Sequence, residues 1–257
     1  MLIKAKTING YKLHATDGEI GTVKDFFFDD RHWTIRYLVV DTGNWLESRQ
    51  VLLSPYAIIS LHKEEEYIEI DLTMQQIEES PPLKLGNPIT VQFEEEYYKY
   101  FGWPMYYFGP YMWGYTPYIE RDPEKWKEFT QDKRAWDPHL RSMEQVGRHD
   151  IEARDGGIGH VDDFVIDDEK WAIRYLIVAT RNWWPGKKVL VSPLWIDRVS
   201  WNEYKVYVSL SRDTIKISPE YTEESLLTRE YESDLYQHYK NKGYWESEKS
   251  DQDRFQH

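Results

Sequence analysis

The stretch DGEIGTVKDFFFDDRHWTIRYLVV, residues 17–40, decides the fold because the chain contains it twice. The second copy, DGGIGHVDDFVIDDEKWAIRYLIV, occupies residues 155–178, at an offset of 138 residues (155 − 17). The offset holds without a gap from residue 2 to residue 81, and roughly 30 of about 80 aligned pairs are identical. A fixed period of this kind predicts two copies of one structural module.

The repeat extends beyond the strand-rich part of each copy. At the same offset, Thr90, Glu94 and Tyr98 match Thr228, Glu232 and Tyr236. Each module is therefore a β-rich segment followed by an aromatic helix, and about 100 residues per copy is a usual domain size. We predict a first repeat at 1–106, an aromatic Pro/Gly linker with a short helix at 107–138, a second repeat at 139–245 and a polar tail at 246–257.

The first copy predicts several short strands separated by turns. Residues 33–40 give the strongest strand because they are mostly aromatic and β-branched. Gly21, inside the preceding strand, indicates a bulge or a tight bend. The other expected extended segments are 8–13, 20–28, 50–53, 57–61 and 66–72, and the expected helices are 93–101 and 226–239.

The composition limits the classes of function. The formal net charge is −13, which argues against a nucleic-acid partner, because such proteins neutralise phosphates with basic patches. The chain has no cysteine, so disulfides, thiol catalysis and zinc–thiolate sites are excluded. No stretch has the length and apolar character of a transmembrane helix, and no signal-peptide core is apparent. We expect a soluble cytoplasmic protein without membrane insertion.

The pattern DGEIGxVxDF, followed by WxIRYLVV and VLLSP, resembles the PRC-barrel family. That family includes the cytoplasmic domain of the photosynthetic reaction centre H subunit, a domain of a bacterial ribosome-maturation factor, and stand-alone proteins. The resemblance covers residues 1–80 and 139–218 and implies one compact SH3-like barrel per repeat. The expected fold is mainly β, with two small SH3-like barrels each followed by a short aromatic helix.

The resemblance implies binding to protein partners and supplies no catalytic residues. The chain lacks the transmembrane helix of the H subunit and carries a second barrel where the ribosome-maturation factor has a different domain. A reaction-centre-like role and association with the ribosome or RNA therefore rest on analogy alone, and the net charge opposes the second of these.

The motif residues allow a chemical and a structural interpretation. The repeated aspartates could hold a cation or act as paired acid and base, but their spacing matches no calcium loop, and we favour turn capping. For Arg36 and Arg174 we favour structural ion pairs with Asp25 and Asp163 over outward contacts to a partner. The expected structural motif is Asp17, Gly18, Gly21, Asp25, Trp33, Arg36 and Tyr37, with the equivalents Asp155, Gly156, Gly159, Asp163, Trp171, Arg174 and Tyr175.

No catalytic constellation is recognisable. The eight histidines have no metal-ligand spacing, and there is neither a phosphate-binding glycine loop nor a nucleophile elbow. We therefore expect no enzymatic activity, no metal and no cofactor.

The copies differ most at one loop. Residues 183–188 read WWPGKK where residues 45–50 read WLESRQ. Because tryptophan dominates interface hot spots, this loop and the aromatic linker at 105–118 could form a recognition surface. We favour the alternative, that most of these aromatic residues pack the barrels against each other and against the helices, with Trp183 and Trp184 as the best candidates for exposure. The candidate partner-binding residues are Trp45, Trp183, Trp184, Lys187 and Lys188.

Two functional hypotheses follow. The first is a non-enzymatic scaffold or interaction module that binds a protein partner of unknown identity. The second is a self-assembling structural protein, in which the chain forms a homodimer through exposed strand edges.

Overall fold

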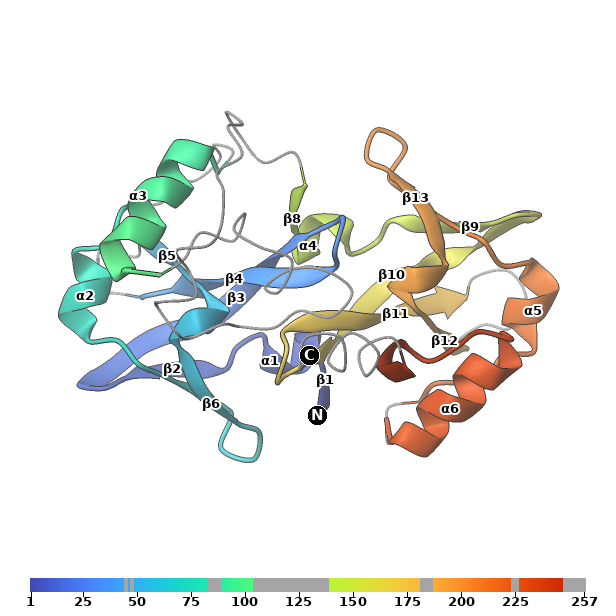
Figure 1. Cartoon of the computed structure of the whole chain (residues 1–257), viewed down its shortest axis with the longest axis horizontal. Helices are drawn as coiled ribbons and strands as arrows, with labels where there is room; N and C mark the ends of the chain where they lie inside the picture. Colours follow the sequence, from blue (N-terminus) through green and yellow to red (C-terminus); the bar gives the residue numbers. More distant parts are fainter. Residues whose placement is uncertain are drawn as a thin grey trace, which may run out of the picture. The chain divides into compact units, whose positions relative to one another are not determined.

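The computed structural model describes residues 1–43, 46, 49–82, 89–103, 139–180, 187–222 and 227–246. The chain divides into two units, each drawn as strands and helices in Figure 1. The amino-terminal unit contains Lys6–Glu144 and Asp168–Ala172. The carboxyl-terminal unit contains Met1–Ala5, Gln145–Asp167 and Ile173–His257.

The amino-terminal unit is built on a sheet in the order β6-β7-β2-β3-β4-β5. Its neighbours are antiparallel except for β2 and β7, which are parallel. The strands are β2 (Lys12–Ala15), β3 (Gly18–Asp29), β4 (Thr34–Asp41), β5 (Gln50–Leu53), β6 (Ile58–His62) and β7 (Tyr67–Ile70). The helices are α1 (Ala5–Ile8), η1 (Pro55–Ala57), α2 (Met74–Glu78) and α3 (Val91–Phe101).

The carboxyl-terminal unit repeats this order as β13-β14-β9-β10-β11-β12, again with one parallel pair, β14 and β9. Its strands are β9 (Asp150–Ala153), β10 (Gly156–Asp167), β11 (Ala172–Thr180), β12 (Lys188–Val191), β13 (Ile196–Ser200) and β14 (Lys205–Val208). Its helices are η3 (Pro193–Trp195), α5 (Arg212–Lys216) and α6 (Arg229–His238), and α4 (Met143–Val146) spans the boundary at Glu144 and Gln145. The expected mainly-β class, with two similar units each followed by helices, is confirmed.

The glycine bend is present in both units. The register of β2 with β3 shifts beside Gly21, and that of β9 with β10 shifts beside Gly159. A Cβ on Gly21 would lie 2.0 Å from the carbonyl O of Asp41, and one on Gly159 would lie 1.9 Å from that of Ala179. Only glycine permits this close approach of two backbones, so these positions fix the predicted bulge.

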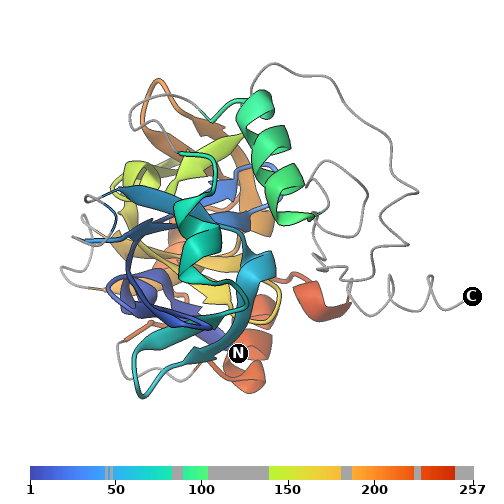
Figure 2. The ribbon, with the colours of Figure 1, turned by 90° about the vertical axis from the view of Figure 1, so that its left-hand side faces the viewer.

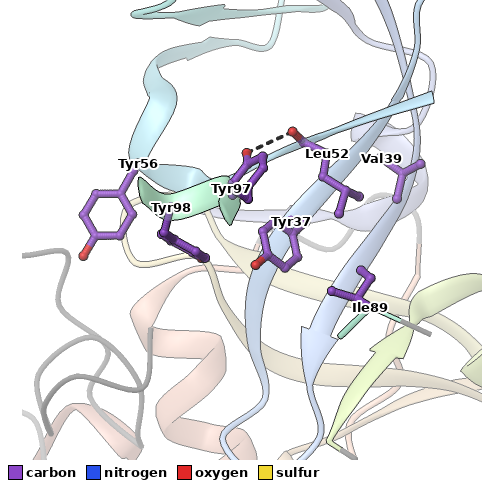
Figure 3. Packing of buried hydrophobic residues seen from close by; sticks show 7 residues of the cluster. All are labelled: Tyr37, Val39, Leu52, Tyr56, Ile89, Tyr97 and Tyr98. Carbon is purple, nitrogen blue, oxygen red and sulfur yellow. Dashed lines mark hydrogen bonds between the residues drawn. The ribbon is translucent and has the colours of Figure 1, made fainter. Parts of the chain in front are cut away.

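Helix α3 confirms the predicted helix at 93–101. Thr90 caps its first turn by accepting a hydrogen bond from the Phe93 amide, and Gly102, at φ 70°, ends it. Figure 2 shows α3 (green) beside the blue strands of its unit. Its buried face completes an aromatic core made of Tyr37, Val39, Leu52, Tyr56, Ile89, Tyr97 and Tyr98, shown in Figure 3. The Tyr97 hydroxyl donates to the carbonyl O of Leu52 at 2.9 Å.

The first strand of each repeat belongs to the sheet of the other repeat. Strand β1 (Leu2–Lys4) pairs with β10 in the carboxyl-terminal unit, and β8 (Leu140–Ser142) pairs with β3 in the amino-terminal unit. The units therefore differ from the predicted boundaries 1–106 and 139–245, because these short strands hydrogen-bond across the repeats. The expected extended segment at 8–13 is also wrong: α1 covers its first residue, and β2 starts only at Lys12.

Candidate functional site

The aspartates that open the repeated motif hold helix N-termini. Asp17 Oδ1 accepts a hydrogen bond from the Met74 amide at 2.8 Å, and Asp155 Oδ1 accepts one from the Arg212 amide at 2.8 Å. Both amides belong to the first residue of a helix, α2 or α5, and such amides need an outside acceptor. The neighbouring Gly18 leaves room for the side chain of Met74, whose Sδ would lie 2.6 Å from a Cβ at that position.

Asp25 does not pair with Arg36, contrary to the expected ion pair. Its carboxylate accepts from Ser142 Oγ at 2.5 Å and from the Glu144 amide at 3.1 Å. Burial raises the pKa of Asp25, although these hydrogen bonds oppose the rise. The equivalent Asp163 is buried and accepts a hydrogen bond from the Phe164 amide at 2.8 Å.

The arginine of the amino-terminal unit pairs with the helix instead. The Arg36 guanidinium forms an ion pair with the Glu94 carboxylate, and both side chains are 0% exposed. The Tyr37 hydroxyl donates to the same carboxylate at 2.7 Å. We call Arg36, Tyr37 and Glu94 the amino-terminal docking centre, because it fastens α3 to β4. The complete burial of Arg36 excludes an outward contact with a partner.

The carboxyl-terminal docking centre consists of Tyr175, Glu232, Arg229 and Tyr244. The Tyr175 and Tyr244 hydroxyls donate to Glu232 Oε1 at 2.8 and 3.0 Å. Arg229 lies 3.0 Å from the other carboxylate oxygen, one helical turn away in α6. These contacts fasten α6 to β11, as those of the first centre fasten α3 to β4.

Arg174, the equivalent of Arg36, is also buried but pairs within the sheet. Its guanidinium contacts Asp167 Oδ2 through Nε and a terminal nitrogen, at 3.1 and 2.7 Å. The same guanidinium lies over the ring of Tyr244, 4.0 Å from the centroid, in a cation–π contact. This partner, Asp167, lies four residues beyond the expected Asp163.

The two motif tryptophans shape hairpin turns. Trp33 and Trp171 are buried and adopt left-handed backbone conformations, with φ of 55° and 54°. Trp33 also stacks on Phe28, with 5.3 Å between the ring centroids. Such a φ is uncommon for a bulky residue, so the buried ring holds the turn in place.

The tyrosines of the docking centres act as hydrogen-bond donors to the glutamates. Burial raises the pKa of the Tyr37 and Tyr175 hydroxyls, and the nearby carboxylates raise it further. Both phenols therefore stay protonated at neutral pH and donate to the glutamates. Among the described residues, no group of three or more His, Cys, Asp or Glu side chains could hold a metal ion. The geometry serves to anchor a helix.

The sequence aligned Glu94 with Glu232 but gave neither a role. The available signal was a carboxylate recurring on the inner face of an aromatic helix, where a charge needs a partner. The sequence also gave no role to a second repeated contact, which joins the long helix of each unit to the short one. The Tyr100 hydroxyl donates to the carbonyl O of Gln76 at 2.9 Å, and His238 Nε2 lies 2.9 Å from that of Thr214.

Of the candidate partner-binding residues, Lys187 immediately precedes β12 and Lys188 is its first residue. Trp45, Trp183 and Trp184 lie outside the described residues. Lys187 Nζ donates to the carbonyl oxygens of Lys216 and Ser218, both at 2.9 Å. Lys188 pairs with Asp162 at 3.0 Å. Both lysines therefore brace their own unit.

Lys187 has a structural counterpart in the other unit. Arg49 donates to the carbonyl oxygens of Glu78 and Ser80, at 3.1 and 2.7 Å. In both units a basic side chain thus ties down the end of a short helix. The residue between the two carbonyls differs: it is the exposed Glu79 in one unit and Ile217, 74% exposed, in the other.

The fold and these contacts define a β protein whose two similar units each fasten a helix through a buried glutamate. Residues 2–75 match the family model of the PRC-barrel domain, so this stretch is a PRC-barrel domain. The resemblance seen in the sequence is confirmed for this region. The second β-rich region, residues 140–208, is similar in structure. A comparison with curated proteins finds no match. None of the described helices is long and apolar enough to cross a membrane.

Proposed function

We propose that the chain is a tandem PRC-barrel scaffold without enzymatic activity that binds a protein partner through its carboxyl-terminal unit. The observation that carries this proposal is Ile217, a 74% exposed apolar side chain where the other unit has Glu79. Lone exposed apolar residues are common, so the neighbourhood matters. Ile217 lies between two residues whose carbonyls bind Lys187, and the sequence places Trp183 and Trp184 just before that lysine.

The surface favours an apolar partner segment. Lys187 and Lys188 contact their own unit, whereas Ile217 exposes its apolar side chain. A few buried anchors, most often Trp, Tyr and Arg, supply most of the energy in protein interfaces, and charged pairs at the exposed rim supply little. We therefore assign recognition to Ile217 with the 181–186 loop, and a bracing role to the lysines.

Affinity purification of the full-length chain from its native host tests this assignment. Ile217→Glu introduces the charge found in the other unit, and Trp183→Ala/Trp184→Ala removes the loop rings. Both should lose the partner that the wild-type chain retains. The matched control is Ile59→Asp, because Ile59 is 55% exposed on β6 and its equivalent is Asp197. Partners retained by both test variants would remove this surface from consideration.

Self-assembly is the second candidate function, and β6 favours it. Strand β6 ends the sheet of the amino-terminal unit and carries the exposed Ile59, whereas the corresponding edge strand β13 carries Asp197 and Arg198. Charges on an edge strand oppose edge-to-edge pairing, and an apolar edge permits it. Sedimentation of the wild-type chain and of Ile59→Asp at high concentration decides the matter. A strict monomer in both would eliminate this candidate.

A further inference from the structure

Each unit accepts a strand from the other repeat in the same register. Strand β1 places Leu2, Ile3 and Lys4 opposite Asp167, Ile166 and Val165. Strand β8 places Leu140, Arg141 and Ser142 opposite Asp29, Phe28 and Phe27. At the 138-residue offset these are the same three pairs. We call β1 and β8 the donor strands, and β10 and β3 the acceptor strands.

This pattern is reciprocal, as in a symmetric dimer where one surface serves both partners. Neither acceptor strand takes the donor strand of its own repeat. The hydrogen bonds of such a pair depend on the two strands and not on the covalent path between them. A donor strand from a second copy of the chain can therefore form the same ladder. The difference is entropic, because the strand of the same chain is already tethered near the acceptor strand.

The two donor strands are held by different side-chain contacts. Three residues of the β8 segment contact partly buried aspartates: His139 and Arg141 bind Asp30 at 2.7 and 3.1 Å, and Ser142 binds Asp25. The β1 ladder instead places Ile3, 6% exposed, opposite Ile166, which is 0% exposed. Both donor strands are three residues long and each is followed by a four-residue helix, α1 or α4. Because its central pair is apolar, we take β1 as the donor strand that exchanges.

We propose that β10 is a docking edge for β1 of a second copy, so that two chains exchange β1 strands reciprocally and form a dimer. The contact would bury Ile3 of each chain against Ile166 of its partner. This inference uses none of the residues assigned to partner binding, and it differs from edge-to-edge pairing at β6 because the dimer gains no new ladder. Exchange becomes populated as the protein concentration approaches the effective concentration of the intramolecular strand, on the order of 1 mM.

Disulfide trapping between full-length chains tests the proposal, because the chain has no native cysteine. Chains carrying Ile3→Cys and chains carrying Ile166→Cys are mixed, unfolded, refolded together at high concentration and oxidised. We expect a covalent heterodimer on a non-reducing gel and a dimer mass by light scattering. Replacing Ile166→Cys with Ile59→Cys, an exposed site on β6, supplies the collision control, which should give several-fold less product.

The contrary results are equally defined. A heterodimer yield no greater than that of the collision control overturns the proposal. A dimer mass without the disulfide overturns it too, because it shows association by another surface. If burial of the cysteines prevents folding, the Lys4→Cys and Val165→Cys pair, which is in the same register, gives the same readout. In the double variant Ile3→Cys/Ile166→Cys, an intrachain disulfide as the only product at every concentration also overturns exchange.

Discussion

The two docking centres share a tyrosine–glutamate hydrogen bond but differ in how the charge of the glutamate is neutralised. Both place a helix glutamate against a tyrosine hydroxyl on an inner strand, β4 or β11, at 2.7 Å in one unit and 2.8 Å in the other. In the amino-terminal unit the buried Arg36 neutralises Glu94. In the carboxyl-terminal unit Glu232 accepts from Tyr244 and pairs with Arg229, whose side chain is 55% exposed.

The difference shows which part of the repeat is essential to docking. The tyrosine–glutamate bond is common to both units, so it defines where the helix attaches. The arginine of the strand is not essential to this bond. In the carboxyl-terminal unit Arg174 pairs with Asp167, and Arg229 of the helix and Tyr244 contact the glutamate. In the amino-terminal unit the carboxylate is held by a fully buried guanidinium and one hydroxyl, and in the carboxyl-terminal unit by two hydroxyls and a half-exposed arginine. Loss of the carboxylate charge should therefore cost more in the amino-terminal unit.

Removing the charge of each glutamate should give the largest difference in stability between the two units. Glu94→Gln removes the carboxylate charge that faces the fully buried Arg36 guanidinium, so we expect a loss of about 3–5 kcal/mol in unfolding free energy. Glu232→Gln retains an oxygen that accepts from a tyrosine, and we expect a loss of about 1–2 kcal/mol. Hydrogen exchange of α3 and α6, read together with urea unfolding, measures the two effects separately.

The matched control for the larger effect is Glu95→Gln, because Glu95 is exposed on the same helix. It removes the same charge without unpairing a buried group, and its effect should stay within about 0.5 kcal/mol. Equal loss of protection in α3 and α6 from the two glutamate variants would show that the arginine arrangement has no energetic consequence.

Truncating a leucine in each donor strand should have the next largest effect on stability, and each truncation should act on a different unit. Leu140 packs against the aromatic core that contains Tyr37 and Tyr97, although it belongs to the second repeat. Leu140→Ala should therefore destabilise the amino-terminal unit by about 2 kcal/mol, the lower end of the range for such truncations, because the site is half-buried. Its equivalent, Leu2→Ala, should act on β10 in the other unit. Hydrogen exchange by peptide locates each effect, and loosening of β9 and β10 by Leu140→Ala would contradict the strand assignment.

Local features of the fold could be predicted from the sequence because their causes are local. Gly21 indicated a bulge, since only glycine allows the backbone approach at Asp41, and Thr90 and Gly102 bound a helix by ordinary caps. The helix at 93–101 and the strands at 50–53 and 33–40 follow from the same short-range rules.

The strand exchange and the arginine partners could not be predicted for a different reason. Two copies of one sequence offer the same acceptor strand, so hydrophobic pattern fixes the register of β1 and β8 but not which copy each one joins. Arg36 was expected to pair with Asp25 on a neighbouring strand. It pairs instead with Glu94, which lies 58 residues away in sequence, on α3. Such a contact depends on how the helix docks, which periodicity does not encode. Trp45, Trp183 and Trp184, chosen for recognition, lie outside the described residues, and their role stays a prediction.

The smallest expected effect is a difference in alkaline stability between wild type and single tyrosine variants. Burial raises the pKa of Tyr37 and Tyr175, and it raises that of Tyr98 to about 12. A group whose folded pKa exceeds its unfolded value stabilises the fold fully below the unfolded pKa, near 10 for tyrosine, and loses that contribution as pH rises further. Stability should therefore fall above about pH 10, with tyrosinate absorbance appearing together with the loss of circular dichroism.

Tyr175→Phe tests whether one centre contributes to that fall. At neutral pH the variant should lose about 1 kcal/mol, because Glu232 keeps its bond from Tyr244. Above pH 10 its stability should decline less steeply than wild type, by about 1.4 kcal/mol per pH unit for the missing group. Tyr37→Phe should flatten the slope in the same way but cost more at neutral pH, since the bond it removes adjoins a buried ion pair. Tyrosinate absorbance that reaches its full value while the circular dichroism is unchanged would show that these hydroxyls ionise in the folded chain, and the linkage would not hold.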